Sequence, residues 1–261
     1  MIPIPESVQV SRNKSAERML LDKSRAWLEQ DNRAVGFHAS DIPDPLQSFW
    51  RILAPEPLSD REVGLFLPGK VLHAFVLGAV DGQKDIDITV SDEGSFYSKD
   101  LDIYFSPDKI LNGKVRELKT SRAFKEPVDL DDIDTYVEQL LIYMAATNTV
   151  SSQLWVLYLN VKDDRGRTAP IFRAFDVVVS KEELEEIKAH VKSTVESIRK
   201  AVEAGSPEGL PLCREWKCGR RNCVWYDKCK PDGRYGTKEF DQLPVPKAPA
   251  VQGIKTPKSR V

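Results

Sequence analysis

Residues 101–119, LDIYFSPDKILNGKVRELK, hold the pattern that decides the fold. Two short runs with β-strand character, residues 101–105 and 115–119, flank the pair Asn112-Gly113. Asn-Gly tolerates positive φ at both positions and is typical of tight turns, so the two runs are predicted to form an antiparallel hairpin. The residues between the first run and the Asn-Gly pair would lengthen its connection.

An acid and a base lie two residues apart in the second run. The period of two along a strand places Glu117 and Lys119 on one face and Leu118 on the other. The hairpin would bring Asp102 alongside Glu117, so that two carboxylates converge. Asp100 shares the face of Asp102 and replaces it if the register shifts by two residues. Asp102 is favoured because the residues around it then form one apolar face.

Two converging carboxylates suit a hard divalent cation such as Mg²⁺ or Mn²⁺. A neighbouring lysine can orient the nucleophile and offset negative charge that develops on a phosphate. The combination indicates metal-assisted phosphodiester hydrolysis. The alternative is an exposed ion pair between Glu117 and Lys119 on a solvated strand face, with no catalytic role.

The composition is that of an ordinary globular protein without a membrane span. The 261 residues are 41% hydrophobic and 30% charged, with a formal net charge of -2. No apolar run approaches the ~20 residues that cross a bilayer. The first residues lack the pattern of a secretory leader, so a cytoplasmic location and no membrane partner are expected.

The periodicities along the chain predict an α/β (α+β) fold with a mixed central β-sheet flanked by helices. A proline-punctuated segment, residues 43–68, is expected to form short turns and helices. Ser180 and Glu183 resemble a capping box that opens a long helix ending at Gly205. The other predicted helices are residues 15–30, a helix that begins at Gly69, and 129–146; the other predicted strands are 85–90, 153–161 and 171–179.

Three further side chains join the constellation. Gln139 and Tyr143 are four residues apart in a predicted helix and therefore share a face. His73 lies in the helix that begins at Gly69. Taken singly, each is read more simply as a structural residue: a buried tyrosine beside a capped glutamine, and a satisfied histidine.

In order and spacing, Gly69, His73, Asp102, Glu117-Leu118-Lys119, Gln139 and Tyr143 resemble the RecB-like nucleases of the PD-(D/E)xK superfamily. With cysteines near the carboxyl end, the chain looks most like the CRISPR-associated Cas-four exonucleases and related phage exonucleases. The resemblance implies a restriction-endonuclease-like core. It also implies a Mg²⁺ or Mn²⁺ site formed by His73, Asp102, Glu117 and the Leu118 carbonyl, with Lys119 as the catalytic lysine and Gln139 and Tyr143 completing the motif.

All four cysteines lie close together, at Cys213, Cys218, Cys223 and Cys229. Four thiolates suit a tetrahedral zinc ion or an iron–sulfur cluster, and the spacing does not decide between them. The family resemblance favours iron and sulfur, as a 4Fe-4S cluster, although the family usually supplies one cysteine ahead of the nuclease core. A disulfide is the third alternative, disfavoured in the cytosol.

Basic and aromatic residues are interleaved with these cysteines. Cations beside flat rings suit single-stranded DNA, so one interpretation is a DNA-gripping flap. The alternative is that the cations offset thiolate charge and the aromatics cover the cluster. The residues expected to bind DNA are Arg214, Lys217, Arg220, Arg221 and Trp225.

The expected function is a metal-dependent DNA exonuclease acting on single-stranded or frayed ends, with an iron–sulfur cluster. The alternatives are a non-catalytic DNA-end-binding or adaptor protein of a recombination or CRISPR-adaptation complex, and a zinc-containing DNA-binding protein. Four regions are expected: an N-terminal helical segment (1–68), the nuclease core (69–205), a cysteine-rich metal module (206–231) and a flexible tail (232–261).

Overall fold

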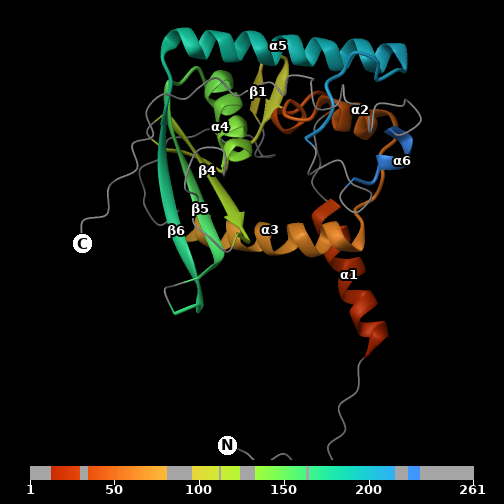
Figure 1. Cartoon of the computed structure of the whole chain (residues 1–261), viewed down its shortest axis with the longest axis vertical. Coiled ribbons are helices and arrows are strands. Elements are labelled where there is room, and N and C mark those ends of the chain that lie inside the picture. Colours follow the sequence, from red (N-terminus) through yellow and green to blue (C-terminus); the bar gives the residue numbers. More distant parts are fainter. Residues whose placement is uncertain are drawn as a thin grey trace, which may run out of the picture.

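A four-stranded mixed sheet forms the centre of the protein, with helices packed around it (Figure 1). The computed structural model describes residues 13–29, 35–80, 96–111, 113–123, 133–162, 165–214 and 223–229. The predicted mixed α/β class with flanking helices is confirmed. The predicted strand at 85–90, residues 129–132 of one predicted helix and the tail at 232–261 lie outside the described residues.

The elements follow one another in an order that alternates helices and strands. They are α1 (Lys14–Glu29), the 3-10 helix η1 (Ala39–Asp41), α2 (Pro45–Leu53), α3 (Asp60–Val80), β1 (Phe96–Ser98), β2 (Ile103–Phe105), β3 (Lys109–Leu111), β4 (Lys114–Ser121), α4 (Asp134–Thr147), β5 (Ser151–Lys162), β6 (Thr168–Val178), α5 (Lys181–Ala204) and α6 (Tyr226–Cys229).

The strand order in the sheet is β3-β4-β5-β6, with β4 and β5 parallel and the other neighbours antiparallel. A parallel pair needs a crossover connection, and α4 supplies it between β4 and β5. Helix α4 packs on these two strands and against α5, so its apolar side chains fill the main core. The predicted cap of α5 is confirmed: Ser180 and Glu183 form a capping box, and Gly205 ends the helix at φ 63°.

The hairpin partner of β4 is β3, not the strand predicted from residues 101–105. Lys109 lies opposite Arg116 in the ladder, and Gly113 in the turn has φ 70°. Asn112, the other residue of the predicted turn, lies outside the described residues. Strand β2 instead pairs with β1 in a separate two-stranded sheet. The connection between β4 and its partner strand is therefore shorter than predicted. This changes the residue that lies opposite Glu117.

Helix α3 begins at Asp60 rather than at Gly69, and it contains Pro68 in its interior. Proline cannot donate to the carbonyl four residues earlier, and here the Gly64 carbonyl accepts a hydrogen bond from Arg122 Nη2 at 3.1 Å. A Cβ on Gly69 would lie 3.3 Å from Thr120 Oγ1, so this glycine lets α3 approach β4 closely. No helix in the part of the chain that the structure describes is both long and apolar enough to cross a membrane.

Candidate active site

Glu117 and Lys119 lie on one face of β4, as predicted, and they contact each other. Lys119 Nζ is 2.6 Å from Glu117 Oε1. The Glu117 side chain is only 3% exposed and that of Lys119 is 19% exposed. The alternative of a solvated surface ion pair is therefore wrong, because the acid is buried within the fold.

The second carboxylate near Glu117 and Lys119 is that of Asp108, the residue immediately before β3. The β3–β4 register continues to place it across from Glu117. Asp108 Oδ2 accepts a hydrogen bond from the Leu118 N–H at 2.6 Å, and the Asp108 N–H lies 3.5 Å from Glu117 Oε2. His73 Nδ1, on α3, is 3.5 Å from Asp108 Oδ1. Asp108 thus joins β4 to α3 at the centre of the site.

The prediction that Asp102 faces Glu117 is wrong. Asp102 lies in an exposed turn before β2 with φ 53°, and β2 is not a neighbour of β4. Its carboxylate accepts a hydrogen bond from Tyr97 Oη at 2.5 Å and forms an ion pair with Arg199 of α5. The rival Asp100 pairs with Lys192 of α5, 2.6 Å away. The predicted apolar face of this strand is confirmed, because Leu101, Ile103 and Phe105 are all buried.

Asp108 could have been found from the sequence. It follows Pro107, and this Pro-Asp pair precedes Glu117-Leu118-Lys119 in the printed chain. That order matches the letters of the PD-(D/E)xK signature itself. The apolar alternation of residues 101–105 drew attention to the earlier strand, whereas β3 has only three residues and gives almost no periodic signal.

Gln139 and Tyr143 extend the site from α4. Lys119 Nζ donates to Gln139 Oε1 at 2.7 Å, and Gln139 Nε2 donates to Tyr143 Oη at 2.6 Å. The Tyr143 hydroxyl in turn donates to the Ser106 carbonyl at 3.3 Å. This chain of hydrogen bonds holds the Lys119 ammonium group between β4 and α4. We call His73, Asp108, Glu117, Lys119, Gln139 and Tyr143 the carboxylate site.

The electrostatics of the carboxylate site favour a proton or a cation beside Glu117. Burial raises the pKa of Glu117 to about 7; the nearby Lys119 ammonium group opposes this shift and the Asp108 carboxylate adds to it. A positive ion bound by both acids would favour the charged form of Glu117. The two carboxylates and one imidazole are a donor set that fits Mg²⁺ or Mn²⁺.

This donor set is not arranged as a finished metal cage. Among the described residues, no group of three or more histidine, cysteine, aspartate or glutamate side chains is close enough to hold a metal ion. Glu117 Oε1 is engaged by Lys119, and Asp108 Oδ2 by the Leu118 N–H. The lysine ammonium group thus occupies one of the carboxylate oxygens that a cation would use.

Three of the four cysteines gather in a second, mainly apolar cluster. Cys213 and Cys229 are buried within it, and Cys223 packs against it. Cys218 lies outside the described residues. The cluster, which we call the cysteine region, also contains Leu46 and Phe49 of α2, Ile198 and Ala201 of α5, Leu210 and Trp225.

Two residues predicted to bind DNA are committed to protein contacts here. The Trp225 side chain is buried, and its Nε1 donates to the Ala54 carbonyl at 2.8 Å, so it is unavailable for stacking on a base. Arg214 forms an ion pair with Glu138 of α4, and their side chains are 14% and 17% exposed. Trp225 is therefore packed inside the protein and Arg214 is held by Glu138, while a role of these residues beside a metal cluster stays a prediction. Lys217, Arg220 and Arg221 lie outside the described residues.

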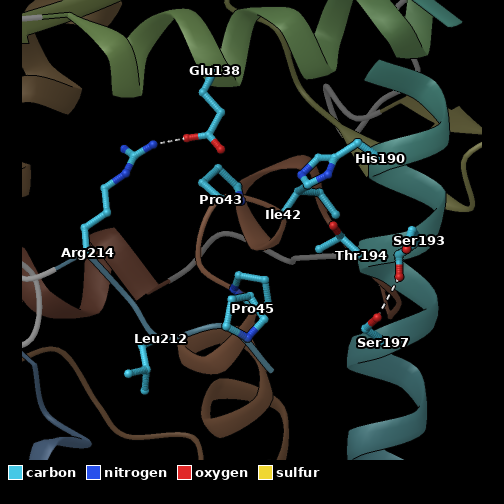
Figure 2. A pocket seen from close by; sticks show the side chains of 11 residues that line it. Ile42, Pro43, Pro45, Glu138, His190, Ser193, Thr194, Ser197, Leu212 and Arg214 are labelled. Carbon is cyan, nitrogen blue, oxygen red and sulfur yellow. Dashed lines mark hydrogen bonds and ion pairs between the residues drawn. The ribbon is translucent and has the colours of Figure 1, made fainter. Parts of the chain in front are cut away.

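A small cavity lies beside the Glu138–Arg214 pair, between α5 and the loop before α2 (Figure 2). Its volume is about 110 Å³, well below the ~300 Å³ of a small-molecule site. His190 points toward it from α5, and burial lowers the pKa of this imidazole. The cavity is smaller than a nucleotide requires.

Comparison with known proteins supports the fold. The chain is similar to SSO0001, known from a crystal structure, with a TM-score of 0.51 and 16% sequence identity over 82% of this chain and 96% of that chain. At this identity the similarity shows the fold alone. No family model matches the chain, and no curated protein matches it.

Proposed function

We propose that the protein is a Mg²⁺- or Mn²⁺-dependent deoxyribonuclease that hydrolyses phosphodiester bonds at single-stranded or frayed DNA ends. The observation that carries the proposal is the buried contact between Glu117 and Lys119, with Asp108 facing it from the residue before β3. Two acids, a lysine and an imidazole from β4, α3 and the loop before β3 meet at this point. The proposal agrees with the resemblance to RecB-like PD-(D/E)xK enzymes and Cas-four exonucleases.

Each residue has a defined task in this proposal. Asp108, Glu117 and His73 would hold the divalent cation, which polarises the phosphate and lowers the pKa of a water molecule. Lys119 leaves Glu117 Oε1 and moves its ammonium group toward the scissile phosphate, where it offsets the developing negative charge. Gln139, which accepts from Lys119, keeps the ammonium group near the site during this exchange. Tyr143 orients Gln139.

We further propose that Cys213, Cys218, Cys223 and Cys229 ligate a 4Fe-4S cluster, with zinc as the alternative. Cys213, Cys223 and Cys229 lie in one region of the fold, which supports the proposal, but among the described residues they are not grouped closely enough to hold a metal ion. Iron–sulfur clusters absorb visible light, whereas zinc does not. A brown preparation that contains as much acid-labile sulfide as iron would therefore indicate the cluster, and a colourless one that contains zinc would indicate the alternative. Reduced thiols of this kind agree with a cytoplasmic location.

The test of activity is digestion of end-labelled single-stranded and double-stranded DNA with Mn²⁺, Mg²⁺ or a chelator. We expect shortening of single strands from an end with either metal and none with the chelator. Glu117→Gln and Lys119→Met should each reduce the rate by about a thousandfold. Lys192→Met removes a surface lysine that pairs with Asp100 and serves as the matched control.

The outcome separates the enzyme from an adaptor protein. If the wild-type protein binds DNA ends and leaves them intact with both metals, the nuclease proposal fails. A partner role in recombination or CRISPR adaptation then becomes the better account. Full activity in both the Glu117 and Lys119 variants would also overturn the proposal.

A further inference from the structure

One face of α3 continues from the carboxylate site to an exposed aromatic side chain. Phe66, Lys70 and His73 are spaced at four and three residues, so they share a face of the helix. His73 lies against Asp108 at one end of this stripe. Phe66, at the other end, is seven residues away, or about 10 Å along the axis at ~1.5 Å per residue. That length corresponds to about three stacked nucleotides at ~3.4 Å each.

A second aromatic ring reaches the same face from α1. Lys70 Nζ lies over the Trp27 ring, 5.1 Å from its centroid. Trp27 is 41% exposed and Phe66 is 50% exposed, so both rings have surface available to a ligand. A cation beside two half-exposed rings is an arrangement that suits unpaired bases and their phosphates.

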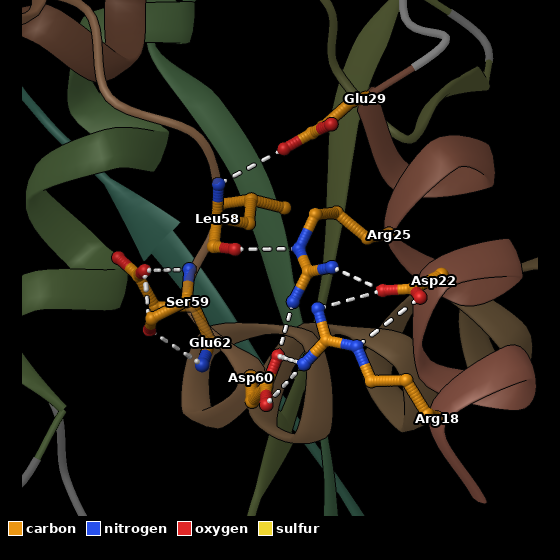
Figure 3. A network of polar contacts seen from close by, with 8 residues as sticks. All are labelled: Arg18, Asp22, Arg25, Glu29, Leu58, Ser59, Asp60 and Glu62. Atoms are coloured by element: carbon orange, nitrogen blue, oxygen red, sulfur yellow. Dashed lines mark hydrogen bonds and ion pairs between the residues drawn. The ribbon is translucent and has the colours of Figure 1, made fainter. Parts of the chain in front are cut away.

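Polar contacts hold α1 against the start of α3 (Figure 3). No residue of α1 is buried, so these polar contacts, rather than a buried apolar face, fix its position. Arg18 and Arg25 both pair with Asp60, at the start of α3. Arg25 Nε also donates to the Leu58 carbonyl at 2.7 Å, and the Leu58 N–H donates to Glu29 Oε1 at 2.9 Å. Asp22 pairs with the same two arginines, so the two aspartates and the two arginines balance in charge.

We infer that Trp27, Phe66 and Lys70, which we call the α1–α3 face, bind single-stranded DNA and guide it to the carboxylate site. The inference rests on the proposed function for its substrate. The rings stack on bases while Lys70 pairs with the backbone. Duplex DNA hides the flat surfaces of its bases, so this face selects unpaired strands. Its continuity with His73 favours the substrate over a protein partner as the occupant.

The test measures binding separately from cleavage. Anisotropy of a labelled oligo(dT) of about 20 nucleotides is recorded in Ca²⁺ and in chelator, alongside a blunt duplex. Trp27→Ala and Phe66→Ala should each weaken oligo(dT) binding at least about fivefold, and leave duplex binding unchanged. In a plot of the logarithm of oligo(dT) affinity against the logarithm of salt concentration, Lys70→Gln should make the slope shallower by about one, which corresponds to the loss of one phosphate contact. Phe172→Ala, which removes a 55% exposed ring from β6, is the matched control and should change nothing.

Each outcome bears on this inference independently of the activity. If wild-type protein degrades DNA while both aromatic variants bind oligo(dT) normally, the α1–α3 face is not the DNA site and the nuclease proposal stands. If the variants bind less oligo(dT) but the wild type never cleaves, the face stands and the nuclease proposal fails. If the substitutions change only the sedimentation of the protein, the face binds a second copy and the inference is wrong. Circular dichroism establishes that each variant is folded.

Discussion

At the carboxylate site each charged side chain is held by another polar group, whereas in the cysteine region the thiols lie among apolar side chains. Glu117 is buried beside Lys119 and near Asp108, and hydrogen bonds continue through Gln139. Cys213 and Cys229 are buried in one cluster with apolar side chains of α2 and α5. One region holds charge inside the protein, and the other joins the chain's later part to its earlier helices.

This difference predicts how each region responds to substitution. Removing a charge from the carboxylate site should change the chemistry, and removing Lys119 should also lower the free energy of unfolding, because Glu117 is then a buried acid without that cation. Removing apolar contacts or the Trp225 hydrogen bond from the cysteine region should mainly change stability, because these interactions hold it against the helices. The Glu138–Arg214 pair connects the two regions, since Glu138 precedes Gln139 and Arg214 follows Cys213.

The largest expected effect separates the two candidate aspartates. Asp108→Asn should reduce DNA cleavage about a thousandfold, because it removes a charged oxygen that faces Glu117. Asp102→Asn is the matched control and should stay within about twofold, because its partners are Tyr97 and Arg199. Rates are measured on one labelled single strand. The reverse pattern would restore the assignment made from the sequence.

The next effect concerns the ion pair between the regions. Arg214→Met or Glu138→Gln alone should lower the free energy of unfolding by about 2 kcal/mol, because each leaves one part-buried charge without this ion pair. The double variant should lose clearly less than the sum. Denaturant unfolding measures all three. The exposed Lys228–Glu56 pair, with both side chains 40% exposed, should cost under about 1 kcal/mol when broken. Equal losses of unfolding free energy for the two pairs would contradict a larger contribution from the less exposed Glu138–Arg214 pair.

The raised pKa of Glu117 predicts that protons compete with the metal. Below about pH 7 the acid is protonated, so Mn²⁺ affinity should fall about tenfold for each further pH unit. Metal-free protein should show the opposite trend in stability. Because the folded-state pKa exceeds the ordinary 4.5, Glu117 binds its proton more tightly when folded, and this stabilisation is lost as pH rises to about 7. Calorimetric titration and thermal unfolding across this range check both, and a flat Mn²⁺ affinity would show that Glu117 is not a ligand.

The smallest effect tests the cysteine region. Trp225→Phe keeps most of the packing but removes the hydrogen bond from Nε1 to the Ala54 carbonyl. The free energy of unfolding should fall by about 1 kcal/mol. Trp27→Phe, at an exposed position, should change it by less than about 0.5 kcal/mol. If both substitutions change the free energy of unfolding equally, the hydrogen bond from the buried Trp225 does not stabilise the fold.

Local sequence signals predicted the elements that local interactions determine. Helix α5 was predicted with both ends because its capping box and terminal glycine lie within the element itself. Strands β5 and β6 were found by periodicity to within about three residues. The same-face relation of Glu117 and Lys119 follows from strand geometry alone, and it led directly to the site.

Features that depend on distant residues were missed. The helix through Pro68 is possible because Arg122 satisfies the Gly64 carbonyl, a contact across the chain that no local pattern reveals. The choice between β2 and β3 as partner of β4 is also non-local, and it decided between Asp102 and Asp108. The burial of Trp225 depends on α2, far earlier in the chain, so composition alone left its role open.

The central claim is that Asp108 and Glu117 share one divalent cation. The most direct measurement is the anomalous scattering of Mn²⁺ in crystals of the whole protein grown at a pH above about 7, where Glu117 is charged. We predict a peak between the two carboxylates, with Lys119 Nζ displaced from Glu117 Oε1. A peak at Asp102 or Asp100, with the Glu117–Lys119 contact intact, would contradict the account.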